Sequence, residues 1–211
     1  MEEKSDKTGM ARGRPRELTI EARRQQIIAA AFDAFVELGF AKTTTAVVAA
    51  KAKVSKRTIY EVFADKITLF AAVVAECQPL ILDLPRPEGE SLEPLDSLVA
   101  IFRLDISDDE ERVREAVLNL IARESVQFPE LSDYLYENKI IRSREALIDW
   151  LHSTPAFGEL STDDAKTYAG MLMDIVFGAL LPRRRLKGTS HRQTRNESIK
   201  QRLAIFLRGV L

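Results

Sequence analysis

Apolar side chains recur at helical spacing along nearly the whole chain, and this pattern constrains the fold more than any other feature of the sequence. No run of β-branched residues alternates with polar residues at period two, and no Asn-Gly or Asp-Gly hairpin turn occurs. Prolines between 79 and 94 interrupt the helical pattern, which then resumes without an internal repeat. The sequence therefore predicts an all-α protein of about nine helices, with a small N-terminal domain and a larger C-terminal one.

Capping residues predict where the N-terminal helices begin. The first apolar stripe runs from Ile20 to Leu38, and Gly39 follows at the position of a left-handed C-terminal cap. Thr, Ser and Asp side chains accept hydrogen bonds from the free N–H groups of a first helical turn. We therefore expect three further helices, capped by Thr44, Ser55 and Asp65 and running to Lys51, Val62 and about Gln78.

Later helix starts are predicted by capping-box spacing at Ser107-x-x-Glu110, Ser161-x-x-Asp164 and Thr194-x-x-Glu197. A long helical pattern covers about 129–152. Residues 1–17 are polar and basic, which is typical of a disordered arm. We therefore divide the chain into this arm, a first helical domain over 18–66 and a second over 67–211.

The net charge of −1 conceals an uneven distribution. Residues 1–66 carry a net +4, residues 67–181 a net −13 and residues 182–211 a net +8. A basic N-terminal part suits a polyanionic partner, although a surplus of this size is also typical of a solvated surface.

The single cysteine, Cys77, excludes an internal disulfide and suits a reducing compartment, where it is more simply a buried apolar group than a redox sensor. No apolar leader precedes the first helix, and the longest apolar stretch, 168–181, is too short to cross a membrane. We therefore expect a cytoplasmic protein without a membrane partner.

The segment 44–63 has the geometry of a helix-turn-helix: two short helices joined by Ala52-Lys53-Val54. Its apolar or small positions would lock the two helices together and against the first helix; they are Val48, Ala49, Ala52, Val54, Ile59 and Phe63. Lys56, Arg57, Thr58 and Tyr60 remain near the exposed start of the second short helix, from which a DNA-binding helix reads bases. Spacing alone does not distinguish this DNA-binding interpretation from a surface pair of helices whose polar residues have no such role.

The residues around this segment resemble the N-terminal part of the tetracycline-repressor (TetR) family. The resemblance covers about 45 residues in one register. It consists of IIAAAFDAFVELGF over 27–40, Thr43-Thr44-Thr45, Val48-Ala49, Ala52, Val54-Ser55-Lys56, Thr58-Ile59-Tyr60, Phe63, Lys66 and Leu69. One departure is Lys53, which stands where the family usually has glycine. If the turn needs a positive φ, Lys53 is strained by about 1–2 kcal/mol, or it adds a phosphate contact.

The resemblance implies a role for each matching residue. Thr44, Thr45, Tyr60 and Lys66 fall on positions that touch phosphates, and Lys56, Arg57 and Thr58 on positions that face the major groove. We expect Arg57 to contact a base, since arginine can bond guanine through two hydrogen bonds. In the arm, Arg12-Gly13-Arg14-Pro15-Arg16 resembles the core of an AT-hook, so Arg12, Arg14 and Arg16 are candidates for a narrow minor groove. The alternative is a solubilising tail.

The family also implies a C-terminal domain that senses a small molecule and pairs two subunits. Two amphipathic stripes, over 165–181 and 197–211, could form a four-helix interface between the subunits of a homodimer. The alternative is that both stripes fill the core of their own subunit. The segment 122–131 resembles a subgroup of efflux and stress regulators. The candidate interface residues are Leu172, Ile175, Leu180, Ile199, Leu203 and Phe206.

The expected function is that of a repressor on double-stranded DNA, released from a palindromic operator by a small molecule. No charged or metal-binding cluster is evident, so we expect an apolar or amphipathic effector, no metal and no cofactor. The alternative is a DNA-bound protein that recruits or blocks a partner without sensing a ligand. An enzyme is not expected, because His152 and His191 lie in no catalytic motif and no phosphate-binding glycine loop occurs.

Overall fold

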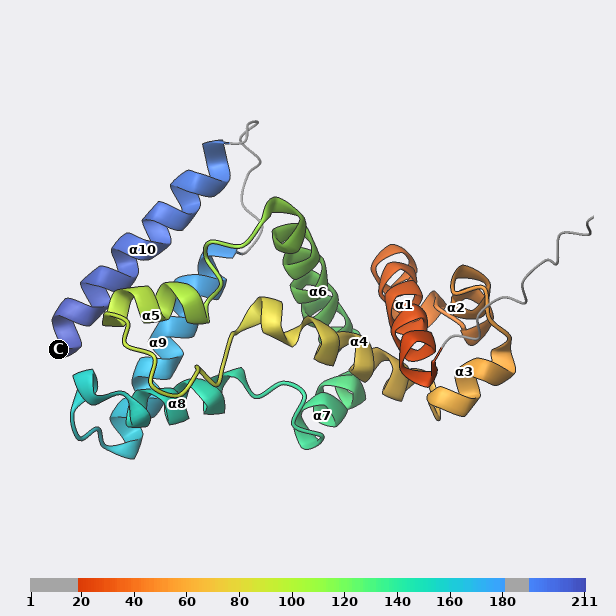
Figure 1. The fold of residues 1–211 in the computed structure, drawn as a ribbon, viewed down its shortest axis with the longest axis horizontal. Coiled ribbons are helices and arrows are strands. Elements are labelled where there is room, and N and C mark those ends of the chain that lie inside the picture. Colours follow the sequence, from red (N-terminus) through yellow and green to blue (C-terminus); the bar gives the residue numbers. More distant parts are fainter. Residues whose placement is uncertain (1–18, 181–189) are drawn as a thin grey trace, which may run out of the picture.

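The computed structural model describes residues 19–180 and 190–211, and over these ranges the protein is entirely helical (Figure 1). The described residues form ten α-helices and one 3-10 helix, without a strand, so the all-α prediction is confirmed with one helix more than expected. In chain order the helices are α1 (Ile20–Lys42), α2 (Thr45–Lys51), α3 (Lys56–Val62), α4 (Lys66–Ile81), α5 (Pro94–Ile101), α6 (Asp108–Gln127), α7 (Pro129–Glu137), α8 (Ser143–Ser153), η1 (Pro155–Phe157), α9 (Thr162–Leu180) and α10 (Ser190–Val210).

Polar side chains cap the early helices at the predicted positions. Thr44, Ser55 and Asp65 each accept a hydrogen bond from the backbone N–H three residues later, at 3.3, 3.0 and 2.7 Å. The predicted capping box of Ser107 and Glu110 forms as well. Each such cap contributes about 1 kcal/mol to helix stability, so these short polar contacts determine where α2, α3, α4 and α6 begin.

The predicted long helix over 129–152 is wrong, because the structure divides it into α7 and α8. Lys139 adopts a φ of 60°, and its N–H bonds back to the carbonyl of Tyr136 at 3.0 Å. The next N–H, of Ile140, bonds to the carbonyl of Leu135 at 2.8 Å. This pair of bonds is the Schellman ending of a helix. Glycine usually occupies the left-handed position, so a lysine there conceals the end of α7.

Two smaller expectations are also corrected. The capping box expected at Thr194 lies inside α10, which is already helical from Ser190. Pro79 does not end α4, which continues to Ile81. The proline lies in the last turn, where it removes a single backbone bond near an end that frays in any helix.

The first helix breaks at Gly39, as the sequence predicted, and then makes one more turn to Lys42. Gly39 has a φ of 79° and a ψ of 169°, a conformation that favours glycine. The buried hydroxyl of Thr43 donates to the carbonyls of Ala34 and Gly39, at 3.1 and 2.7 Å, and closes the break.

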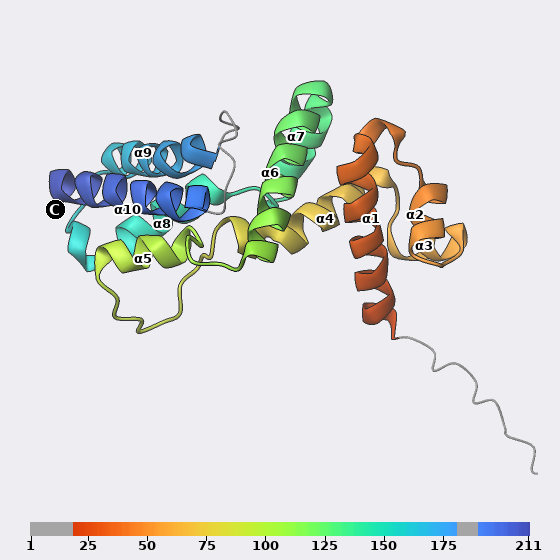
Figure 2. The ribbon, with the colours of Figure 1, turned by 90° about the horizontal axis from the view of Figure 1, so that it is seen from above.

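Two hydrophobic clusters form the core. The first joins α1, α2, α3 and most of α4 with side chains from α6 and α7, and the second joins the end of α4 with α5, α6, α8, α9 and α10. The clusters divide within α4, between Val74 and Cys77. Figure 2 shows α4 and α6 between the two ends of the molecule. We call the α1–α3 end the head.

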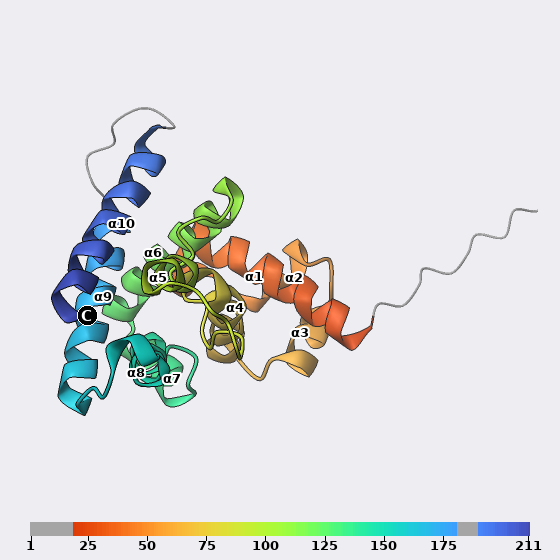
Figure 3. The same cartoon turned by 60° about the vertical axis from the view of Figure 1, so that its left-hand side comes forward.

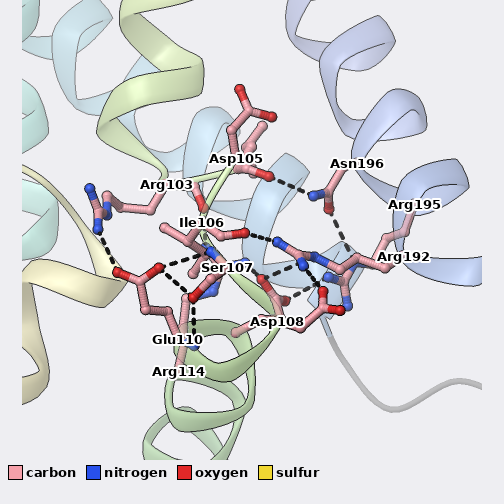
Figure 4. Close-up of polar contacts among 12 residues, drawn as sticks. Arg103, Asp105, Ile106, Ser107, Asp108, Glu110, Arg114, Arg192, Arg195 and Asn196 are labelled. Carbon is pink, nitrogen blue, oxygen red and sulfur yellow. Dashed lines mark hydrogen bonds and ion pairs between the residues drawn. The ribbon is translucent and has the colours of Figure 1, made fainter. Parts of the chain in front are cut away.

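A polar network attaches α10 to the turn between α5 and α6 (Figure 4). Arg114 of α6, buried, donates to two carbonyls just after α5 and pairs with the buried Glu111. From α10, Arg195 reaches Glu111 at 2.6 Å, Asn196 donates to a carbonyl of the turn at 2.6 Å, and Arg192 contacts the first residue of α6. Buried charges require such partners, so α10 has one defined position beside α9, at the end of the molecule away from the head (Figure 3).

Candidate nucleic-acid interface

The head is packed as the sequence predicted. Val48, Ala49, Ala52, Ile59 and Phe63 are each at most 5% exposed and belong to one cluster with the buried face of α1. These contacts fix the position of α3 relative to α1 and α2. The exposed side of α3 is therefore presented on a rigid base.

The turn between α2 and α3 requires a left-handed residue, and Lys53 supplies it. Lys53 has a φ of 52°, with its N–H bonded to the carbonyl of Ala50 at 3.3 Å. The N–H of Val54 bonds to the carbonyl of Ala49 at 3.0 Å, which completes a Schellman ending. The condition for strain at Lys53 is thus met. The lysine side chain itself is exposed.

The N-terminal side chains of α3 face solvent. The Arg57 side chain is 88% exposed, and Lys56 and Tyr60 are also exposed. Thr58 is half-buried, and its hydroxyl shares a 2.8 Å hydrogen bond with that of Ser55. Arg57, Lys56 and Tyr60 are therefore accessible to a partner, whereas Thr58 is less so.

The start of α2 lies beside the exposed side of α3. The hydroxyls of Thr45 and Tyr60 share a hydrogen bond of 3.3 Å. Thr44 is exposed, although its hydroxyl already accepts the capping bond of α2. The structure thus brings together three of the residues predicted to touch phosphates, and hydroxyl groups of this kind position a protein on the DNA backbone.

Lys66, the fourth residue predicted to touch a phosphate, makes a contact inside the protein. Its ammonium donates to the carbonyl of Phe40 at 2.9 Å and stands 4.1 Å from the centroid of the Phe40 ring. Burial lowers the pKa of Lys66, while the nearby Glu124 carboxylate opposes that shift. The side chain therefore joins α4 to the end of α1. A phosphate contact at Lys66 remains a prediction that rests on its backbone N–H in the first turn of α4.

Two contacts near α3 were not predicted. Glu61 accepts a hydrogen bond from Nε of Arg57 at 2.9 Å, and this contact raises the pKa of Arg57. The spacing of four residues could have indicated this pair. Arg24 of α1 stands over the Phe63 ring, 5.5 Å from its centroid. The arm residues Arg12, Arg14 and Arg16 lie outside the described residues.

The C-terminal turn of α6 contacts the head at the break in α1. Glu124, 2% exposed, pairs with Arg123 at 2.8 Å, and a Cβ on Gly39 would stand 3.2 Å from its carboxylate. The ring of Phe128, which follows α6, lies 5.3 Å from the ring of Phe40. We call this group the junction. Periodicity did not reveal it, because charged residues near a helix end usually face solvent.

A cavity of about 440 Å³ lies in the C-terminal domain, among α4, α6, α7, α8 and α9. Its size is typical of sites for small organic molecules. The aromatic ring of Phe177, on α9, lies on the cavity wall. The apolar lining residues are Ile81, Leu118, Ile121, Ile141, Met173 and Phe177, and the polar ones are Gln78, Tyr136, Ser143, Arg144 and Glu145.

The residues predicted for a subunit interface lie mostly inside their own subunit. Leu172, Ile199 and Leu203 are 0% exposed and Phe206 is 6% exposed, so these four offer no surface to a partner. For them, the alternative that the stripes fill the subunit core is what the structure shows. Ile175 is half-buried, and the side chain of Leu180 lies outside the described residues. Among the described side chains of α9 and α10, the large apolar ones that are exposed are Met171 and Ile205, at 46% and 60%.

Other chemistry finds little support in the described residues. They contain no group of three or more His, Cys, Asp and Glu side chains that could hold a metal ion. Burial raises the pKa of the Cys77 thiol to about 11, which disfavours the nucleophilic thiolate. None of the described helices combines the length and apolar character that a membrane span needs.

A rigid head with an exposed recognition helix, joined by α4 and α6 to a helical domain with a cavity, defines a helix-turn-helix transcription regulator. Residues 27–73 match the model of the bacterial regulatory proteins of the tetR family. Residues 110–209 match the model of the AefR-like transcriptional repressor C-terminal domain. Together the two models cover more than two thirds of the chain. The chain belongs to the TetR family, as its sequence pattern predicted.

Known proteins similar to this chain agree with that assignment. YvkB, an HTH-type transcriptional regulator of Bacillus subtilis, is 24% identical over 189 residues, which span 88% of this chain and 96% of YvkB. The structure of Salmonella enterica GusR has a TM-score of 0.64 at 22% identity and covers 90% of this chain and 95% of its own. The flavonoid-responsive regulator FrrA has a TM-score of 0.56 at 24% identity, over 89% and 96% of the two chains.

Proposed function

We propose that this chain is a repressor that binds a palindromic operator as a homodimer and leaves it when a small apolar or amphipathic molecule fills the cavity. The observation that carries the proposal is that the cavity is built on the same two helices that contact the head. Gln78 and Ile81 line it near the end of α4, and Leu118 and Ile121 line it on α6. Flavonoid-responsive FrrA shares the fold, and flavonoids are small molecules with apolar ring faces.

On DNA, each head would place α3 in a major groove. Arg57 would contact a base, Lys56 and Thr58 would face the groove, and Thr45 and Tyr60, whose hydroxyls are bonded to each other, would hold the phosphate backbone along one side of it. The arginines of the arm would add contacts in a neighbouring minor groove. Two heads related by a two-fold axis explain why the operator is expected to be a palindrome.

Dimerisation would use the outer face of α9 and α10. TetR-family regulators act as dimers, and in this chain the inner faces of both helices are already buried. Met171 and Ile205 are large apolar side chains that remain exposed among the described residues of these helices. A four-helix contact formed by this face would set the distance between the two heads, and that distance decides whether both heads fit successive grooves.

Release would follow from the connection between the cavity and the junction. Ile121 lines the cavity, and Glu124 lies one turn later against Gly39. Lys66, the first residue of α4, donates to the carbonyl of Phe40 at the end of α1, and Gln78 lines the cavity three turns further along α4. A ligand that binds better when α4 and α6 are displaced would favour a head spacing that does not fit the operator.

The test of DNA recognition is a selection of operator sequences from random DNA, followed by affinity measurements on the selected site. We expect Arg57→Ala with Tyr60→Ala to weaken binding at least a hundredfold, since a base contact is worth about 1–3 kcal/mol. Arg112→Ala is the matched control, because Arg112 is 75% exposed on α6 and distant in sequence from the head. Unchanged affinity in the double variant would refute the role assigned to α3.

The test of release is the same measurement in the presence of a library of small molecules. A compound that lowers operator affinity and also binds the DNA-free protein supports the repressor mechanism. If every compound that binds the cavity leaves operator affinity unchanged, the alternative of a DNA-bound protein that recruits or blocks a partner gains support.

A further inference from the structure

Tyr136, Arg144 and Glu145, three of the polar residues that line the cavity, form one corner of its wall. The hydroxyl of Tyr136 donates to the Glu145 carboxylate at 2.7 Å. Tyr136 is 59% exposed, so this corner is where the cavity meets solvent. The hydrogen bond lowers the pKa of Glu145. The carboxylate therefore stays ionised at neutral pH, and one of its oxygens is already engaged.

Cationic side chains accompany this carboxylate. Arg144 lines the cavity, and both Arg142 and Arg144 lie close enough to Glu145 to help lower its pKa. Of these two arginines, Arg144 is the one that lines the cavity. Within residues 19–180 and 190–211, no residue accepts a hydrogen bond from the Arg144 side chain. Arg144 therefore has an unused, fork-shaped set of donors that fits a carboxylate.

The rest of the cavity is apolar. Leu118 and Ile121 of α6, Met173 and Phe177 of α9 and Ile81 of α4 form its walls. A ligand body without polar atoms loses little on entering such a space, and burial of apolar surface contributes roughly 25 cal/mol per Å². An organic cation is disfavoured, because it would meet Arg144 and a carboxylate already bonded to Tyr136.

We propose that the cavity takes a lipophilic organic acid, with its apolar body between α6 and α9 and its carboxylate paired with Arg144. This inference names the chemical class of the effector and so rests on the proposed function. Binding itself can be measured without DNA. Aliphatic and aromatic acids share the required chemistry, and the probes below distinguish them.

The test compares matched probes by isothermal titration calorimetry at pH 7.5, below micelle-forming concentrations. Decanoate, decanol and decylammonium share one alkyl chain, and 2-naphthoate and 2-naphthalenemethanol share one ring system. We expect the acid of at least one set to bind about tenfold or more tightly than its alcohol, as a charged hydrogen-bonded pair allows. Decylammonium is expected to bind most weakly.

Substitution of Arg144 shows whether the preference comes from this corner. Arg144→Gln is expected to weaken binding of the acid about tenfold and to leave the alcohol unchanged, while Arg144→Lys retains most of the preference. Arg112→Gln, on the exposed N-terminal turn of α6, is the control and should change neither. Circular dichroism verifies that the variants are folded.

Several results would overturn the inference: equal binding of acid and alcohol in both sets, tightest binding of the ammonium, or an acid preference that survives in Arg144→Gln. These outcomes are separate from failure of the proposed function. An acid that binds through Arg144 but leaves operator affinity unchanged would refute effector release and keep the ligand class. Release by neutral compounds alone, without acid binding, would keep the repressor and refute the ligand class.

Discussion

Replacing Lys53 with glycine is expected to make the protein more stable. Lys53 has a φ of 52°, where a residue with a Cβ carries a cost of about 1–2 kcal/mol. Glycine removes this cost, but the greater backbone freedom of glycine in the unfolded chain lowers the free energy of unfolding by about 0.5–1 kcal/mol. Both backbone bonds of the turn come from N–H groups that glycine retains. The free energy of unfolding should therefore rise by about 0.5–1 kcal/mol, which for a chain of this size raises Tm by roughly 1–4 °C.

Lys53→Ala is the matched control for this experiment. It removes the same charged side chain but keeps the Cβ and the strain. Urea and thermal unfolding, followed by circular dichroism, should place Lys53→Gly above Lys53→Ala in stability by about 1 kcal/mol. Equal stability of the two variants would refute the argument, because it would mean that the turn does not penalise a Cβ.

The same two variants also decide whether Lys53 touches DNA. Both lose one positive charge, so a phosphate contact would weaken operator binding equally in both. The slope of log affinity against log salt would fall by about one per lost contact. A loss in Lys53→Ala alone would instead indicate that the turn geometry, not the charge, controls binding.

Three further predictions concern the junction, the dimer face and the buried thiol. Gly39→Ala should lower the free energy of unfolding by about 1–2 kcal/mol, because φ is 79° and the new Cβ would crowd Glu124. Gly209→Ala is the control: Gly209 lies in a helix, a Cβ there would meet open space, and the substitution should not destabilise the protein. Ile205→Glu should shift the protein from dimer to monomer in light scattering, whereas Val126→Glu, equally polar and on exposed α6 surface, should not. Cys77, with its pKa raised from 9.0 to about 11, should react with a disulfide reagent at pH 8 about a hundredfold more slowly in the folded protein than in urea. The difference between the two rates should decrease as pH rises toward 11. Equal rates at pH 8 would contradict the burial of Cys77.

The sign of that pH dependence follows from the raised pKa. The folded protein favours the protonated thiol, so the contribution of Cys77 to stability is complete below pH 9. It is lost as pH rises through the folded-state value near 11. A Cys77→Ala variant should show a smaller loss of stability over this range than the parent protein, measured by urea unfolding.

The head was predictable because its information is local. Thr44, Ser55 and Asp65 cap helices through atoms three residues away, and Ile59 and Phe63 repeat at helical spacing on one face. Contacts of this range depend on side chains near in sequence. The expectation of strain at Lys53 was conditional, because it came from the glycine that the family usually has at this position.

The sequence left alternatives open where the role of an apolar or charged residue depends on distant elements, and it missed one helix end. Leu172 and Leu203 form stripes that fit either a core or an interface, and only the packing of α9 and α10 on the rest of the subunit shows that they are buried. The ammonium of Lys66 donates to the carbonyl of Phe40, 26 residues away in sequence, a contact that no local pattern indicates. The end of α7 at Lys139 was hidden because lysine replaced the usual glycine.

The sequence by itself determined the all-helical class, the helix-turn-helix and the family, because helix periodicity, caps and turn length are local properties of the chain. Only the tertiary structure decided which face of α10 is free, that Glu124 meets Gly39, and that Arg144 borders an apolar cavity. Each of these depends on segments tens of residues apart. Their proximity is set by the packing of complete helices against one another, which no single stretch of sequence encodes.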